Sequence, residues 1–373
     1  MMSTARQDNS LEPQRLPMEE ISTDVSVAQV GMDDGYADTK VALPDGRLVS
    51  IPSRARVGQA GVTWIRETAQ SIFEYKTEGT VYSVGVVDGE PTQFDEYPTS
   101  GLNRVIVQHA LHQAGLSGRS VHLVSGLPVG RFYRKDGQRR QTLIDQKCDS
   151  LKKTVEPLTR EGNPDGSRLK TSVAFHEVIP EALAAWYDHV IDCDKENVRL
   201  DTEKLSAPIA IVDIGGRTTD YVVVQNQAVV HGASGSLNRG LLDVKAWVSN
   251  GIEEHFDVVN IGEQRLDHAV KANTLRLHGK AYDVTDLVKS AKHELVERLY
   301  METRRQLGQG AELDRILFVG GGSAALATDI ADWFPNQTIA DHAAFANARG
   351  MLKYLQYVCD DRITPGHKPD DNE

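Results

Sequence analysis

Two segments of the chain, 180 positions apart, repeat one plan. Residues 30–43 read VGMDDGYADTKVAL, and residues 210–224 read AIVDIGGRTTDYVVV. Each segment has an apolar stretch that ends in an aspartate, a tight turn with glycine, and a second apolar stretch. The separation of Asp33 and Asp213 is about the length of one domain. A duplicated α/β domain, with one such turn in each copy, explains this repeat.

The residues at the two turns are suited to binding phosphate. Glycine lets backbone N–H groups approach an anion closely, Thr218 and Thr219 add hydroxyl donors, and Lys40 adds a cation. Two carboxylates that face one site repel each other unless a cation lies between them. Asp33 and Asp213 are therefore best explained by a shared Mg²⁺, held largely through water. One turn alone would be weak support, because Asp-Gly turns are common.

A third glycine-rich element follows late in the chain, where residues 315–326 read RILFVGGGSAAL. This pattern predicts a strand, a turn at Gly320, Gly321 and Gly322, and a helix that opens at Ser323. The glycines would permit close contact with a flat base or ribose, although a plain strand-to-helix turn also explains them. A dinucleotide-binding Rossmann domain is not indicated, since no G-x-G-x-x-G follows the first strand.

Strand-like and helix-like patterns alternate along the chain, which is typical of an α/β protein. A polar stretch within residues 192–206 separates two such regions. We expect two duplicated α/β domains between two disordered tails. The predicted boundaries are an N-terminal tail at 1–25, domain I at 26–205 with a returning helix at 340–358, domain II at 206–339, and a C-terminal tail at 360–373.

Composition narrows the functions that such a chain can have. The formal net charge is −12, with 41 Lys and Arg against 53 Asp and Glu, so direct binding to nucleic acid is disfavoured. The three cysteines lack metal-ligand spacing, and their odd number argues against a disulfide framework. No apolar run approaches the ~20 residues that cross a bilayer. We therefore expect a cytoplasmic protein that does not associate with membranes.

At these residues the chain resembles the superfamily of actin, heat-shock chaperones and sugar kinases. Within it, the sequence is most similar to the ParM/StbA family of bacterial actin-like plasmid-segregation ATPases. MDDGYADTK and DIGGRTTD resemble the two phosphate motifs, FVGGGSA the adenosine motif, and VIPEALAAWYDH and FANARGMLKYL the two connecting helices. All five elements occur in the expected order. The resemblance implies an actin-like ATPase fold, in which two duplicated, ribonuclease H-like α/β domains have a nucleotide cleft between them.

The resemblance also implies a role for individual residues, with ATP and Mg²⁺ as cofactors. Glu181 would orient or deprotonate the attacking water, although it could also be a first-turn carboxylate stabilised by the helix dipole. Asp33 and Asp213 would organise Mg²⁺. The other expected contacts to nucleotide come from Asp34, Gly35, Lys40, Gly215, Gly216, Arg217, Thr218, Gly240, Lys289, Lys292, Gly320, Gly321, Gly322 and Ser323.

The resemblance further implies a dynamic head-to-tail filament that moves plasmid copies apart, coupled to centromere DNA through a ParR-type adaptor. A filament results when a contact between copies does not close on itself. The first phosphate loop departs from the family pattern, because Tyr36-Ala37 stands where a small hydroxyl pair is common. A small-molecule kinase that phosphorylates a sugar or an acid is the alternative within the same superfamily.

Overall fold

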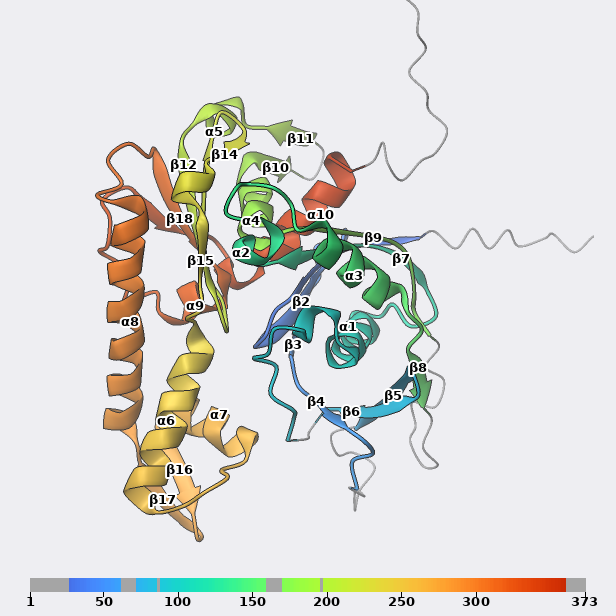
Figure 1. Ribbon diagram of the computed structural model, residues 1–373, viewed down its shortest axis with the longest axis vertical. Helices are drawn as coiled ribbons and strands as arrows, with labels where there is room; N and C mark the ends of the chain where they lie inside the picture. The colour runs from blue at the N-terminus through green and yellow to red at the C-terminus, as the bar shows by residue number, and fades with distance from the viewer. Residues whose placement is uncertain (1–26, 62–71, 86–87, 159–169, 195–196, 360–373) are drawn as a thin grey trace, which may run out of the picture.

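The computed structural model describes residues 27–61, 72–85, 88–158, 170–194 and 197–359. The predicted tails at 1–25 and 360–373 lie outside these residues. Two sheets, each with its own apolar core, divide the described residues into a first and a second lobe. In Figure 1 the second lobe lies on the left and the first lobe on the right.

The sheet of the first lobe has the order β3-β2-β1-β7-β9. Strand β1 pairs antiparallel with β2 and parallel with β7, and β7 pairs parallel with β9. Strand β1 has buried apolar residues at its centre, such as Val30 and Met32, and ends in Asp33 and Asp34. The register of β1 and β2 places Asp33 opposite Lys40. The strands are β1 (Ala28–Asp34), β2 (Asp38–Ala42), β3 (Leu48–Pro52), β7 (Ser120–Leu127) and β9 (Ser172–Pro180).

The sheet of the second lobe repeats this plan in the order β14-β13-β12-β18-β19, and β15 also pairs with β13. Strand β12 pairs antiparallel with β13 and parallel with β18, as β1 does with β2 and β7. All six residues of β12 are buried, and Asp213 stands at its end. The strands are β12 (Ile209–Ile214), β13 (Thr219–Gln225), β14 (Ala228–Val229), β15 (Gly235–Leu237), β18 (Arg315–Val319) and β19 (Gln337–Ile339).

Two helices, α4 (Glu181–Val190) and α10 (Ala346–Tyr357), cross at the centre of the molecule. Helix α10 packs on β1, and a Cβ on Gly31 would lie 2.1 Å from the carbonyl oxygen of Ala348. A Cβ on Gly350 would lie only 1.7 Å from the carbonyl oxygen of Ala184. Helix α10 thus packs against the first sheet, although β19, the strand that precedes it in the sequence, belongs to the second sheet.

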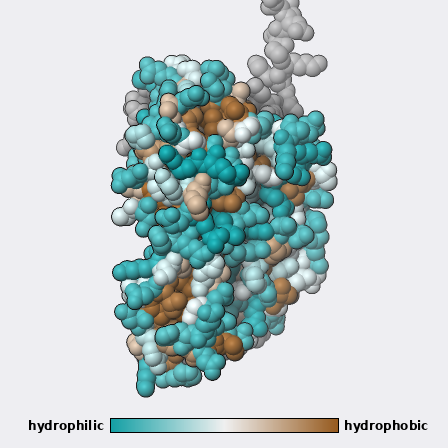
Figure 2. Space-filling model, turned by 60° about the vertical axis from the view of Figure 1, so that its left-hand side comes forward, coloured by the Kyte–Doolittle hydropathy of each residue, from teal (hydrophilic) through white to brown (hydrophobic). Residues whose placement is uncertain are grey.

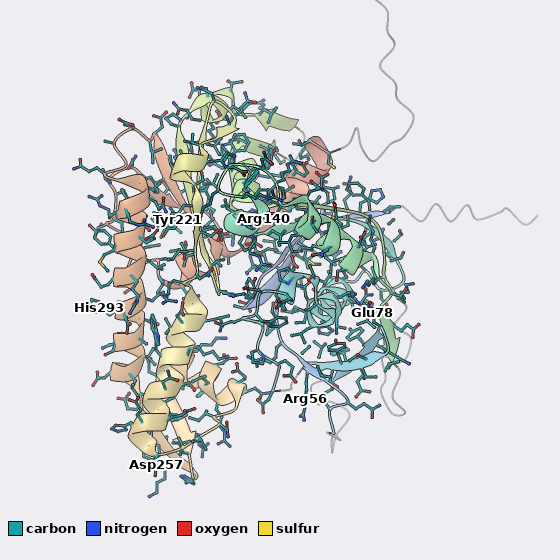
Figure 3. The ribbon with its side chains drawn as sticks, in the orientation of Figure 1. Arg56, Glu78, Arg140, Tyr221, Asp257 and His293 are labelled. Atoms are coloured by element: carbon teal, nitrogen blue, oxygen red, sulfur yellow. The ribbon has the colours of Figure 1, made fainter. Side chains whose placement is uncertain are left out.

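Helices α6 (Leu241–Phe256) and α8 (Thr285–Leu307) pack on the second sheet. Tyr221 of β13 lies towards α8 (Figure 3), and its hydroxyl is 3.1 Å from Thr303 Oγ1. The exposed face of α8 carries charged pairs such as Glu294 with Arg298. Figure 2, which brings this side forward, shows a mostly hydrophilic surface with separate hydrophobic patches.

Smaller elements extend the two lobes. The first lobe adds α1 (Gly101–Gln113), α2 (Val129–Phe132), α3 (Gln141–Lys152), a short helix η1 (Tyr97–Thr99) and a second sheet of order β4-β6-β5-β8. Its strands are β4 (Ala55–Val57), β5 (Phe73–Thr77), β6 (Thr80–Val84) and β8 (Glu156–Leu158). The second lobe adds α7 (Glu263–Ala272), α9 (Gly320–Ala325), the hairpin β16 (Thr274–Leu277) with β17 (Lys280–Asp283), and the short helices η2 (His231–Ala233) and η3 (Ala343–Phe345). Strands β10 (Ile191–Asp194) and β11 (Asn197–Leu200) and helix α5 (Thr202–Ser206) connect the lobes.

Candidate functional site: a phosphate pocket between two lobes

The two repeated turns and the triple glycine face one pocket between the lobes. Turn β1–β2 lines it from the first lobe, turn β12–β13 and the start of α9 line it from the second, and α4 and α10 each contribute a residue. Of the residues expected from the sequence, twelve line the pocket: Asp33, Gly35, Lys40, Glu181, Asp213, Gly215, Gly216, Arg217, Thr218, Gly320, Gly321 and Gly322.

Asp33 and Asp213 are both buried at the ends of equivalent strands. Burial, together with the charge of Asp33, raises the pKa of Asp213 to about 7, against the opposing effect of its hydrogen bond from Asn347. The charge of Lys40 lowers this pKa but does not outweigh burial and the second carboxylate. The pair therefore provides a place where a cation would be strongly favoured.

Lys40 is the cation that these carboxylates share. Its ammonium lies 3.6 Å from Asp33 Oδ2. Burial lowers the pKa of Lys40, but the nearby charges of Asp33, Asp38 and Asp213 outweigh burial, so the pKa is raised overall. Lys40 is thus held in its charged form inside the pocket, as a residue that contacts phosphate oxygens must be.

Glu181 stands at the first position of α4, directly after Pro180, and lines the pocket. Burial raises the pKa of Glu181 well above its ordinary range, and the charges of Asp33, Asp220 and Asp213 add to this effect. With these charges around it, Glu181 is favoured in its neutral form. A cation bound in the pocket would favour its charged form, in which a carboxylate can accept a proton.

Glycines are required where backbone segments meet around the pocket. Gly320 has a φ of +88°, and a Cβ there would lie 2.2 Å from Asp213 Oδ1. A Cβ on Gly216 would lie 2.7 Å from the Cβ of Ala37, so the two phosphate loops touch each other. Gly321 has open space around it, which leaves room for a ligand beside the start of α9.

Asp220 holds the second loop in shape. It accepts hydrogen bonds from Thr218 Oγ1 at 3.0 Å, from the backbone N–H of Val129 at 2.8 Å and from Ser236 Oγ. Burial raises the pKa of Asp220 to about 6, although these hydrogen bonds favour the charged form. Because Val129 belongs to the first lobe, Asp220 also joins the two lobes behind the pocket.

Five residues expected from the sequence are not among those that line the pocket. Asp34 points the other way, because strand neighbours face opposite sides of a sheet, and it binds Lys147 at 2.8 Å and Asn103 at 2.9 Å. Gly240 packs behind the second loop, against the carbonyl oxygens of Gly215 and Gly216. Lys289 and Lys292 lie on α8, and Ser323 is fully buried in α9.

One residue that contacts an acidic residue of the pocket was not predicted from the sequence. Asn347 of α10 lines the pocket, and its side-chain N–H₂ donates a hydrogen bond of 2.7 Å to Asp213 Oδ2. Its buried Oδ1 has no hydrogen-bond partner. No spacing in the sequence could reveal this contact, since 134 residues separate the two side chains.

A second, wider pocket forms the mouth of the same cleft and shares Tyr36 and Ala37 with the first. One ion pair bridges it, because Arg54 of the first lobe binds Asp267 of α7. Within the second lobe, Lys245 of α6 also binds Asp267, at 2.8 Å, and Glu263.

The charges of the inner pocket fit magnesium with a nucleotide phosphate chain. Buried carboxylates with raised pKa values call for a cation, and glycine loops with Lys40 and Arg217 suit an anion. Among the described residues, no group of three or more His, Cys, Asp or Glu side chains is placed to ligate a metal. A cation between Asp33 and Asp213 would need water for its remaining ligands, which is compatible with Mg²⁺ because this ion usually keeps several waters.

Two similar lobes around a phosphate pocket, each with an antiparallel hairpin at its centre, define the actin-like ATPase fold. Residues 28–192 match the family model described as plasmid segregation protein ParM, N-terminal, and residues 211–332 match archaeal actin homologue MreB-like, C-terminal. The match of residues 28–192 confirms the resemblance to the ParM/StbA family over that region, and residues 211–332 are similar to an archaeal family of actin homologues.

Individual relatives agree with this assignment. An archaeal actin homolog from Thermoplasma acidophilum is 24% identical over 86% of this chain and 96% of its own length. The crystal structure of an archaeal actin homolog superposes with a TM-score of 0.68 at 20% identity, covering 88% of this chain and 99% of that one. A 15-stranded ParM filament from Clostridium botulinum gives 0.67 at 18% identity, with coverage of 88% and 99%. Within the described residues, no helix is both long and apolar enough to cross a membrane.

Proposed function

We propose that this chain is a Mg²⁺-dependent ATPase that assembles into ATP-dependent filaments and segregates low-copy plasmid DNA. The observation that carries the proposal is the meeting of Asp33, Asp213, Lys40 and Glu181 with the glycines of both phosphate loops in one pocket. Solved relatives with ADP or AMPPNP bound support a nucleotide as the ligand.

Each side chain has a defined task in the hydrolysis of ATP to ADP and phosphate. Lys40 binds phosphate oxygens, and the backbone of Gly35, Gly215 and Gly216 approaches the phosphate chain. Phosphoryl transfer to water depends on positioning and on charge neutralisation. Bound Mg²⁺ supplies charge neutralisation at the phosphates. Glu181 orients the attacking water and accepts its proton.

Hydrolysis would change how the two lobes are joined. The phosphate loops belong to opposite lobes, so a ligand that contacts both favours the closed arrangement, and loss of the terminal phosphate removes some of these contacts. Copies that stack head to tail in the closed form would make an open-ended filament. The filament described for the Clostridium botulinum ParM relative supports self-assembly here.

The remaining assignments rest on the family resemblance. Plasmid DNA would be reached through a ParR-type adaptor bound to the centromere, because a chain with net charge −12 is poorly suited to direct DNA binding. The protein would act in the cytoplasm and without a membrane. Domain I at 26–205 with the returning helix, and domain II at 206–339, would be the two bodies that move.

The test compares phosphate release and light scattering of the purified protein with Mg-ATP and with Mg-ADP. Wild-type protein should release phosphate and scatter light with Mg-ATP, and should scatter less with Mg-ADP. Glu181→Gln should bind ATP normally, hydrolyse it about 100-fold more slowly, and scatter light for longer. Glu203→Gln is the matched control, since Glu203 also lies in the first turn of a helix but is exposed on α5.

Two results would contradict the proposal. Unchanged hydrolysis by Glu181→Gln would remove the catalytic role of this residue. A rise in ADP release that requires an added sugar or organic acid, without light scattering, would favour the small-molecule kinase instead.

A further inference from the structure

Arg217, in the second phosphate loop, binds two residues of the first lobe. Its guanidinium donates a hydrogen bond of 2.7 Å to Asp95 Oδ1, and its central carbon lies 5.1 Å from the centre of the Tyr36 ring. Both Arg217 and Tyr36 line the phosphate pocket. This one side chain therefore joins the two lobes at the edge of the site.

The two partners of Arg217 differ in how firmly they are held. Tyr36 is buried, its ring lies 5.1 Å from that of Tyr97, and its carbonyl oxygen accepts a hydrogen bond of 2.6 Å from Thr92. The side chain of Asp95, by contrast, is 69% exposed. Stacking on Tyr36 is thus a fixed contact, whereas an exposed ion pair contributes little and exchanges readily with other partners.

Tyr36 and Ala37 of the first loop, which line the pocket beside Arg217, provide no Ser or Thr side chain. The first loop has Tyr36-Ala37 in place of a pair of small hydroxyl residues, and Ser53 Oγ, which is near this loop, is engaged with the carbonyl oxygen of Gly35 at 2.6 Å. A guanidinium presents five N–H donors in a plane and pairs with phosphate through two parallel hydrogen bonds. Arg217 can therefore replace the missing hydroxyl donors.

We propose that Arg217 is a clasp that exchanges Asp95 for the terminal phosphate of a nucleoside triphosphate while it stays stacked on Tyr36. In the absence of the terminal phosphate, Arg217 binds Asp95 and joins the lobes by a surface ion pair. When the phosphate is present, Arg217 joins the lobes through the ligand. The inference rests on the proposed nucleotide function and adds to it the residue that distinguishes triphosphate from diphosphate.

Titration calorimetry with Mg²⁺ tests the clasp, using ADP and a non-hydrolysable ATP analogue. Arg217→Ala should weaken binding of the triphosphate about tenfold or more and binding of ADP by less than about threefold. Arg217→Lys keeps the charge but loses the planar fork, so it should recover only part of the triphosphate affinity. Asp95→Asn removes the competing carboxylate and should bind the triphosphate more tightly than wild type.

The matched control is Arg305→Ala, which removes an arginine that pairs with Glu302 on the distant helix α8 and should leave both affinities unchanged. Equal losses for both nucleotides in Arg217→Ala would overturn the clasp, as would no loss at all, because a merely structural arginine does not separate the two ligands. If Arg217→Ala does not fold, the comparison of Arg217→Lys with Asp95→Asn decides. Wild-type protein that binds neither nucleotide would overturn the proposed function and the clasp together.

Discussion

Asn347 of α10 donates a hydrogen bond of 2.7 Å to Asp213 at the end of β12. The helix that carries Asn347 packs on the sheet of the first lobe, whereas Asp213 belongs to the second. The contact therefore fixes one carboxylate of the candidate magnesium site relative to the other lobe. It also favours the charged form of Asp213.

Substitution of Asn347 should affect both metal-dependent binding and stability. Asn347→Ala removes the donor and leaves a buried carboxylate with one partner fewer, which costs about 1–3 kcal/mol in the free energy of unfolding. Binding of Mg-ATP should weaken more than binding of ATP in the presence of EDTA, because Asp213 is then poorly placed for the ion. Calorimetry with and without Mg²⁺ checks this difference. An equal loss under both conditions would contradict it.

The contribution of Asp213 and Asp220 to the stability of the nucleotide-free protein should be lost as the pH rises from about 5 to about 8. Burial raises the pKa of Asp213 to about 7 and that of Asp220 to about 6, both above the usual value of a free aspartate. The folded state therefore binds more protons than the unfolded state below these values, and stability is lost as the pH rises through them. Thermal unfolding across this range measures the effect.

Asp213→Asn supplies the control for the pH dependence. It removes one of the groups with a raised pKa, so its melting temperature should fall less steeply with pH than that of the wild type. Addition of Mg²⁺ to the wild type should also flatten the curve, since a bound cation stabilises the charged carboxylates. A curve for Asp213→Asn as steep as that of the wild type would contradict the assignment.

The ion pair between Arg54 and Asp267, which links the two lobes, should slow the release of nucleotide. Arg54→Ala removes the link between the first lobe and Asp267 of α7. Pairs of this kind contribute about 0–1 kcal/mol, so release of a fluorescent nucleotide should accelerate by up to about fivefold at low salt. The difference should shrink at high salt because ions screen the pair. Arg298→Ala, which breaks an exposed pair within α8, should have no effect on release.

The crossing of α10 and α4 should not tolerate a methyl group. A Cβ at Gly350 would lie 1.7 Å from the carbonyl oxygen of Ala184, and neither backbone can move without disturbing a core. Gly350→Ala should destabilise the protein by about 3 kcal/mol or more, measured by chemical denaturation. Gly232→Ala, where a Cβ meets nothing within 4 Å, is the matched control and should change stability by less than about 1 kcal/mol.

The parts of the fold that depend on local sequence could be predicted. The pattern at 315–326 predicts a strand followed by a helix, and β18 spans Arg315–Val319 and α9 Gly320–Ala325. The predicted start of the helix at Ser323 is wrong, because the helix begins at Gly320 and includes the three glycines. Helices α3 and α6 and strand β9 were not predicted.

In the site, too, the features formed by consecutive residues could be predicted, whereas contacts between distant segments could not. The turns around Asp33 and Asp213 could be recognised because the chemistry of each is contained in a few consecutive residues. The contacts of Asn347 with Asp213 and of Asp34 with Lys147 could not, because packing of distant elements brings these side chains together. Asp34 in particular shares a loop with Asp33 but faces the opposite side of its strand.

The position of α10 has a consequence for how the molecule is made. Strand β1 lies near the beginning of the chain, and the helix that covers it is formed by residues 346–357. During synthesis this face of β1 stays uncovered by α10 until more than 300 further residues have been added. The nascent chain therefore exposes an apolar surface on β1 while those residues are translated.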